Sequence, residues 1–132
     1  MKNLIYKLEN LKKAFARLEE VSNFYDGTND MIRDSLIQRF EFVAELTHKT
    51  LNETLRYMGV NLENRFPRTI YKYAYQNFLI DDENLWLALI QDRNCTSHMY
   101  AEEVAINLAR KIQNQYIPII SKLICKIEEI IA

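Results

Sequence analysis

The sequence predicts an all-α fold, an up-and-down antiparallel bundle of about five helices. The chain has 132 residues, of which 48% are hydrophobic, with only two glycines and two prolines. Sheet proteins need many tight turns, which are rich in these two residue types, so their scarcity favours helices. Apolar residues also recur at spacings of three and four along most of the chain, which is the helical period. The length fits one domain, 1–132, with an adequate core.

The first two helices are predicted over about 2–24 and 30–58. The polar turn between them ends in Asn29 and Asp30, either of which can cap the second helix. Gly59 stands where a C-terminal cap is expected, because glycine adopts the left-handed conformation without strain. Each helix carries one apolar stripe that marks its buried face. The stripes are Leu4, Leu8, Leu11, Phe15, Leu18 and Val21, and then Ile32, Leu36, Phe40, Val43, Thr47, Leu51, Leu55 and Met58.

Two shorter helices are expected next. After a connector, the third covers about 67–78, where Pro67 is tolerated at the first helical position. Asp81 and Asp82 are then placed to cap a fourth helix that ends near Arg93.

The last helix is expected to begin near Tyr100, with Glu102 and Glu103 favourably placed in its first turn. Pro118 lies inside this pattern and should kink the helix, because proline removes a backbone donor and crowds the preceding turn. The C-terminal half of the helix is apolar on more than one side, which is wider than one buried face needs. The apolar residues beyond one buried face form either a partner surface, part of the ordinary core or a frayed apolar end.

Composition excludes several functional classes. A net charge of −1 and 27% charged residues argue against a protein that coats nucleic acid through a basic surface. Cys95 and Cys125 stand alone, so neither a zinc site nor a disulfide is expected. The charged N-terminus does not read as a secretory signal, and no apolar run reaches the length of a membrane span. We therefore expect a cytoplasmic protein with no membrane association.

The segment 92–100, Asp-Arg-Asn-Cys-Thr-Ser-His-Met-Tyr, gathers most of the chemistry. Arg93 can hold a phosphate or carboxylate through a planar fork of donors, and His98 can exchange protons near neutral pH. In an unbroken helix, residues five apart point roughly 140° away from each other. The intervening residues are mediocre helix formers, so we expect a helix end near Arg93 and a new helix from about 98–101. That break would bring both side chains to one site, beside backbone N–H groups that suit an anion.

With these residues in view, the chain resembles HEPN-domain proteins. More narrowly, it resembles the small nucleotidyltransferase substrate-binding proteins that pair with a minimal nucleotidyltransferase. Three stretches carry the match, residues 32–42, 79–86 and 92–100, and their order and spacing agree over roughly 4–125. The last stretch contains the family's Arg-x4-His signature followed by x-Tyr.

This resemblance implies a helical bundle that dimerises and brings two Arg/His motifs toward one cleft. It also implies a toxin–antitoxin arrangement, in which the HEPN protein is an endoribonuclease toxin. The cognate minimal nucleotidyltransferase would be the antitoxin and would transfer AMP onto the motif's tyrosine. On this chain, Arg93 and His98 take the catalytic positions, Asn94 is the polar neighbour and Tyr100 is the AMP acceptor.

Two positions depart from the family pattern. Relatives commonly have Trp where this chain has His48, which we expect to serve packing or the surface rather than chemistry. Ala101 stands where an acidic or amide helix cap often stands, and a missing cap could loosen the geometry of Tyr100.

The expected reaction is RNA cleavage without a metal or other cofactor, in which a ribose 2′-OH attacks the adjacent phosphate. His98 would act as general base or acid. Arg93 would hold the non-bridging oxygens and stabilise the charge of the transition state. Asn94 or Ser97 would orient the phosphate or the imidazole. One His98 per chain supplies either base or acid, and a homodimer supplies the second.

Alternatives remain open at this stage. His98 could bond a backbone carbonyl at a helix start, Arg93 could form an ion pair with Asp92 or Glu102, and Tyr100 could be an aromatic with a solvated hydroxyl. A basic strip at helical spacing is expected to be a solvated face rather than a contact with RNA or a partner; it consists of Arg65, Arg68 and Lys72. The functional alternative is a non-catalytic subunit that binds a nucleotide or substrate for the transferase.

Overall fold

The computed structural model describes residues 1–96 and 101–132, and every regular element within these ranges is helical. The all-α prediction is therefore confirmed for this part of the chain. Three predicted site residues, Ser97, His98 and Tyr100, lie outside the described residues. The helices are α1 (Lys2–Phe24), α2 (Asp30–Tyr57), α3 (Pro67–Gln76), α4 (Glu83–Cys95), α5 (Glu102–Lys111) and α6 (Ile117–Ile131), with a π-helical segment η2 (Ile112–Tyr116) between the last two.

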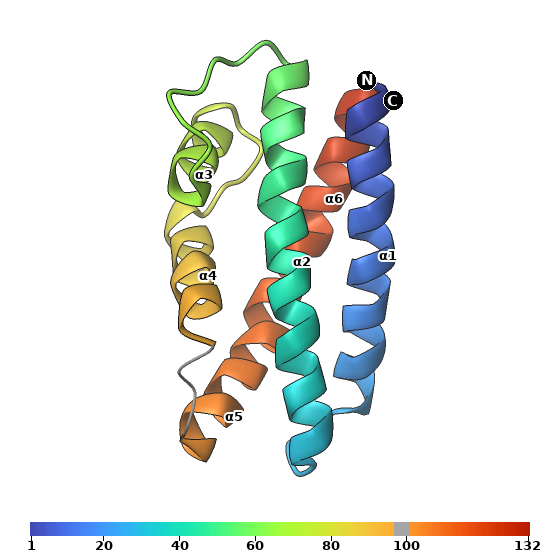
Figure 1. Cartoon of the computed structure of the whole chain (residues 1–132), viewed down its shortest axis with the longest axis vertical. Coiled ribbons are helices and arrows are strands. Elements are labelled where there is room, and N and C mark those ends of the chain that lie inside the picture. Colours follow the sequence, from blue (N-terminus) through green and yellow to red (C-terminus); the bar gives the residue numbers. More distant parts are fainter. Residues whose placement is uncertain (97–100) are drawn as a thin grey trace.

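The helices form a bundle around α2, which contacts α1, α3, α4 and α5. Figure 1 shows α1 and α2 side by side, with α3 and α4 following one another along the other flank of α2. Because α5, η2 and α6 are continuous, the architecture amounts to five helical segments, as predicted. The continuous run of α5, η2 and α6 crosses behind α2 and brings α6 against α1. Both chain ends therefore lie at the same end of the bundle (Figure 1).

Side-chain caps fix where two of the helices begin. Asn29, rather than Asp30, caps α2: its side-chain oxygen accepts from the backbone N–H groups of Met31 at 2.9 Å and Ile32 at 3.1 Å. Asp82 caps α4 by accepting from the N–H of Leu85 at 3.1 Å. These bonds satisfy donors that have no partner inside the helix.

Asp81 was also predicted as a cap of α4 and has a different role. Its carboxylate pairs with Lys122 of α6 at 2.5 Å, across the bundle. Asp82 alone provides the cap, because its side chain reaches the first turn of the helix.

Helix ends differ from the prediction by about two residues. Helix α3 ends at Gln76 rather than at residue 78, because Phe78 adopts a left-handed φ of +63° that cannot continue a helix. Helix α4 continues past Arg93 to Cys95, and the Thr96 hydroxyl then donates to the carbonyl oxygen of Arg93 at 2.9 Å. Gly59 has a φ of +84°, which fits its predicted place after α2.

The last helical segment does not simply kink at Pro118. The helix widens first, into η2, and Pro118 then lies in the first turn of α6. A wider turn accommodates the missing backbone donor of proline. Ile112 and Tyr116 of η2 are fully buried, and the Tyr116 ring stacks on Phe40 of α2 at a centroid distance of 5.4 Å.

The wide apolar pattern of α6 is mostly core. Ile120, Leu123, Ile124 and Ile127 are buried. The remaining isoleucines of the helix are partly buried against the same core; they are Ile117, Ile119, Ile130 and Ile131. This favours the core interpretation of α6 over a separate partner surface. In the described ranges, no helix is long and apolar enough to cross a bilayer.

Candidate functional site

Arg93 lies in the last turn of α4 and lines a small cavity of about 70 Å³ between α2, α3 and α4. Asn94, which was predicted to assist it, lines the same cavity and is otherwise exposed. The complete described lining is Ala44, Glu45, His48, Pro67, Tyr71, Leu89, Ile90, Arg93 and Asn94. The structure therefore brings together the first two members of the predicted site.

The guanidinium of Arg93 has a fully buried Nε with no hydrogen-bond partner among the described residues. The structural alternatives for this residue were ion pairs with Asp92 or Glu102. Both carboxylates are engaged elsewhere, Asp92 with Lys111 at 2.9 Å and Glu102 with Arg33 at 3.6 Å. An unpaired buried donor costs about 1–3 kcal/mol, so such groups call for an explanation.

Asp92 instead anchors the end of α4 to the last helical segment. It accepts from Lys111 Nζ at 2.9 Å and from the hydroxyl of Tyr116. Burial raises the pKa of Tyr116, and the hydrogen bond to Asp92 and the charge of that residue raise it further. The phenol therefore stays protonated and keeps donating at physiological pH.

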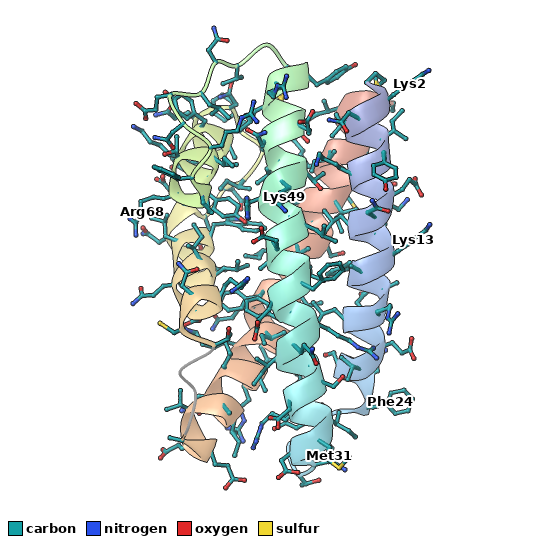
Figure 2. All side chains as sticks on the ribbon, viewed as in Figure 1. Lys2, Lys13, Phe24, Met31, Lys49 and Arg68 are labelled. Carbon is teal, nitrogen blue, oxygen red and sulfur yellow. The ribbon has the colours of Figure 1, made fainter. Side chains whose placement is uncertain are left out.

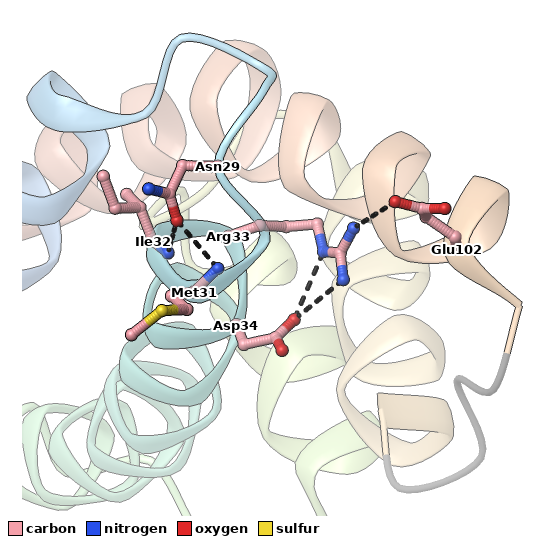
Figure 3. Close-up of polar contacts among 6 residues, drawn as sticks. All are labelled: Asn29, Met31, Ile32, Arg33, Asp34 and Glu102. Atoms are coloured by element: carbon pink, nitrogen blue, oxygen red, sulfur yellow. Dashed lines mark hydrogen bonds and ion pairs between the residues drawn. The ribbon is translucent and has the colours of Figure 1, made fainter.

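Arg33 anchors the start of α5 in a comparable way (Figure 3). Its side chain is only 11% exposed and pairs with Asp34 at 3.2 Å and with Glu102 at 3.6 Å. Glu102 belongs to the first turn of α5, so this bond ties the helix start to α2. Sequence interpretation gave Arg33 no role, although it lies in the first of the three stretches that carry the family resemblance.

The expected anion site at the start of α5 is not favoured by its surroundings. Ala101 is the N-cap residue and makes no side-chain cap bond, as its departure from the family pattern implied. A cleft of about 430 Å³ opens beside this helix start. Its lining contains Arg33 but also four carboxylates, those of Asp30, Asp34, Glu41 and Glu102. Their charge disfavours a phosphate on this side.

Glu45 and His48 are neighbours of Arg93 that sequence interpretation missed. His48 Nε2 lies 3.2 Å from Glu45 Oε2, and Lys49 Nζ lies 3.3 Å from Glu45 Oε1. The His48 side chain is 17% exposed, which agrees with a partly packed residue, but it packs on the wall of the Arg93 cavity. The available signal was the i, i+3 spacing of the pair on α2 together with the departure from Trp at position 48.

The basic strip at the start of α3 is exposed, in agreement with a solvated face. Arg65, Arg68 and Lys72 all have exposed side chains, and Figure 2 shows Arg68 extending away from the bundle. The positions of Ser97, His98 and Tyr100 relative to Arg93 remain predictions, since these three residues lie outside the described ranges.

A family comparison covers nearly the whole chain. Residues 6–129 match the family described as nucleotidyltransferase substrate binding protein like. The chain belongs to this family. The resemblance drawn from residues 32–42, 79–86 and 92–100 is thereby confirmed.

Several known proteins resemble the chain in sequence and in structure. A Haemophilus influenzae protein described as probable ribonuclease HepT is 31% identical over 120 residues, which are 81% of this chain and 82% of the relative. A crystal structure from Thermus thermophilus superposes with a TM-score of 0.80 at 28% identity, over 89% of this chain and 98% of that one. A Haemophilus influenzae structure, described as the fold of a substrate binding domain of a nucleotidyltransferase, gives a TM-score of 0.79 at 28% identity, over 92% and 98% of the two chains.

A more distant structure shares the fold. It is a tri-AMPylated Shewanella oneidensis HEPN toxin in complex with an MNT antitoxin, with a TM-score of 0.73 at 19% identity over 96% of both chains. At this identity the likeness establishes the bundle architecture alone.

Proposed function

We propose that this chain is a HEPN toxin-type subunit that cleaves RNA without a metal, using Arg93 and His98. The observation that carries the proposal is the uncommitted guanidinium of Arg93, whose buried Nε has no described partner while Asp92 and Glu102 are held elsewhere. A cation without an ion pair to any described residue is available for a phosphate. The relative described as a probable ribonuclease supports the same reaction class.

In the proposed reaction, the ribose 2′-OH attacks the adjacent phosphorus and the bond to the 5′ oxygen of the next nucleotide breaks. His98 takes the proton from the 2′-OH or delivers one to the leaving oxygen. Arg93 stabilises the negative charge on the non-bridging oxygens in the transition state. Asn94 and Ser97 would orient the phosphate or the imidazole. The products are a 2′,3′-cyclic phosphate and a free 5′-hydroxyl, and no cofactor takes part.

The proposed assembly is a homodimer with a minimal nucleotidyltransferase antitoxin as partner. In a homodimer, the His98 residues of two protomers supply both a base and an acid. Tyr100 would be the residue that receives AMP, seven positions after Arg93 in the chain. A bulky anion there would block the cleft and compete for the guanidinium. The AMPylated Shewanella toxin supports this arrangement by analogy of fold.

The alternative function is a non-catalytic subunit that binds a nucleotide or substrate for a transferase. The description of the Haemophilus structure as a substrate binding domain of a nucleotidyltransferase favours it. Both functions use the same arginine, and they differ in whether His98 must transfer protons.

Cleavage and binding can be separated with purified protein in the presence of EDTA. We expect the wild type to degrade RNA and His98→Ala to be inactive, while both still bind the nucleotidyltransferase. Arg56→Ala is a matched control, because Arg56 is exposed and pairs with Glu53 at 3.2 Å on α2. If wild type and His98→Ala are equally inert and both bind the transferase, the binding subunit is the correct function.

A further inference from the structure

The cavity beside Arg93 contains a single described carboxylate, that of Glu45 on α2. The remaining described lining is apolar apart from His48, Tyr71 and Asn94. Tyr71 is fully buried, and both its burial and the charge of Glu45 raise its pKa, so it adds no charge at neutral pH. Glu45 thus supplies the one described negative charge in the lining of this cavity.

Glu45 is itself held in place from two sides. His48 Nε2 lies 3.2 Å from Oε2, and Lys49 Nζ lies 3.3 Å from Oε1. Burial raises the pKa of Glu45, but the hydrogen bonds and charges of His48 and Lys49 outweigh it, so the pKa is lowered overall. An ionised carboxylate only accepts, so His48 Nε2 must carry the hydrogen.

A buried cation is stable only when an opposite charge or a hydrogen-bond acceptor is close. Arg93 Nε is buried, and the neighbouring carboxylate of Asp92 is occupied by Lys111 and Tyr116. The negative charge of Glu45 can act electrostatically on Arg93 across the cavity. The cavity volume of about 70 Å³ also leaves room for a water molecule that bridges the two side chains. Glu45 is therefore the described group of this cavity that can serve as a counter-charge for the guanidinium.

We propose that Glu45, held by His48, is the positioning residue for Arg93. The proposal rests on the proposed nuclease function. In this role, Glu45 fixes the side of the guanidinium that carries the buried Nε. The remaining N–H groups of the guanidinium then meet the phosphate in one geometry. The role of His48 is to donate one N–H to Glu45, which makes this pair part of the same site although α2 carries none of the predicted catalytic residues.

The steady-state kinetics of RNA cleavage test this role. Glu45→Gln keeps the size of the side chain but removes its charge, and we expect kcat to fall about tenfold with KM within about twofold. His48→Phe removes the ring N–H and should have a similar effect, whereas His48→Trp keeps a ring N–H and should retain most of the activity. Glu53→Gln breaks an i, i+3 pair elsewhere on α2 and should leave kcat unchanged. Wild-type kcat in Glu45→Gln, or equal losses in the Phe and Trp variants, would overturn the proposal.

A double-mutant cycle in urea tests the pairing without relying on cleavage. Glu45→Gln leaves Arg93 without its counter-charge, so it should lower the urea midpoint strongly in wild type and weakly in an Arg93→Gln background. Additive shifts would overturn the inference whether or not the protein cleaves RNA. If the wild type is inert but the shifts are non-additive, the nuclease function is wrong and the positioning of Arg93 by Glu45 stands.

Discussion

Two arginines, Arg33 of α2 and Arg93 of α4, have side chains that are used in opposite ways. Arg33 is committed to Asp34 and Glu102, which are 3.2 and 3.6 Å away. Arg93 has no described ion pair, and its Nε is buried without a described partner. The first arginine serves the scaffold, whereas the second has no described contact of this kind.

Alanine substitutions should therefore separate stability from activity. Arg93→Ala should reduce RNA cleavage by at least about 100-fold, the scale of losing one transition-state donor. Its free energy of unfolding should change by less than about 1 kcal/mol, since Arg93 Nε makes no direct hydrogen bond to a described residue that the substitution would break. Arg33→Ala should lower the free energy of unfolding by about 1 kcal/mol, because it breaks a hydrogen-bonded ion pair.

Urea unfolding and a cleavage assay on the same protein samples measure both effects. The account is contradicted if Arg93→Ala destabilises the protein more than Arg33→Ala does and retains its activity.

Tyr116 should make the protein sensitive to alkaline pH. Its folded-state pKa is raised above the ordinary value of 10.0, chiefly by burial and then by Asp92. The fold thus favours the neutral phenol, so its contribution is complete below about pH 10 and is lost as pH rises further. Tyr116→Phe should lower the free energy of unfolding by about 1 kcal/mol at pH 7, because the hydrogen bond to Asp92 is lost. It should also flatten the decline in the free energy of unfolding above about pH 10.

The check is urea unfolding from pH 7 to 11. Tyr71 is also buried with a raised pKa, so Tyr71→Phe should remove a separate part of the decline. An unchanged pH dependence in Tyr116→Phe would mean that its phenol ionises in the folded state.

At the scale of helices, the ends that lead into the site are fixed by contacts with other elements. The end of α4 is held through Asp92 to Lys111 and Tyr116, and the start of α5 is held through Glu102 to Arg33. The start of α5 nevertheless lacks a side-chain cap, because Ala101 has no acceptor.

A serine at position 101 should stabilise the start of α5. Ala101 has a φ of −86° and a ψ of 127°, the extended conformation of an N-cap residue. Ala101→Ser supplies an acceptor without adding charge to the acidic cleft, and should raise the free energy of unfolding by about 1 kcal/mol. Asn29→Ala, which deletes the cap of α2, should lower it by a similar amount.

Thermal or urea unfolding of the two variants provides the comparison. No gain in Ala101→Ser, alongside a clear loss in Asn29→Ala, would show that this end of α5 does not need a side-chain cap.

Local signals predicted the helices well and their exact ends less well. The caps at Asn29 and Asp82 follow from residue types within one or two turns. The end of α3 depends on the left-handed φ of Phe78, a conformation that sequence patterns do not predict for an aromatic residue. In η2, Tyr116 stacks on Phe40 of α2, a contact between distant segments that local patterns do not predict.

At the scale of the whole molecule, the bundle followed from composition and periodicity, whereas the surroundings of Arg93 did not. Glu45 and His48 lie more than forty positions before Arg93, and only the packing of α2 against α4 brings them to one cavity. A single sequence does not give this helix register. Arg93 and Asn94 could be proposed from the sequence, because a guanidinium and an amide next to a helix end are recognisable locally.

Cleavage of a short RNA with one susceptible linkage, in EDTA, tests the central claim most directly. The claim is that Arg93 and His98 direct a 2′-OH onto the neighbouring phosphate. We predict a product with a 2′,3′-cyclic phosphate, and no cleavage when the 2′-OH at that linkage is replaced by hydrogen. Cleavage of the deoxy-substituted RNA, or products with 5′-phosphate ends, would contradict the account.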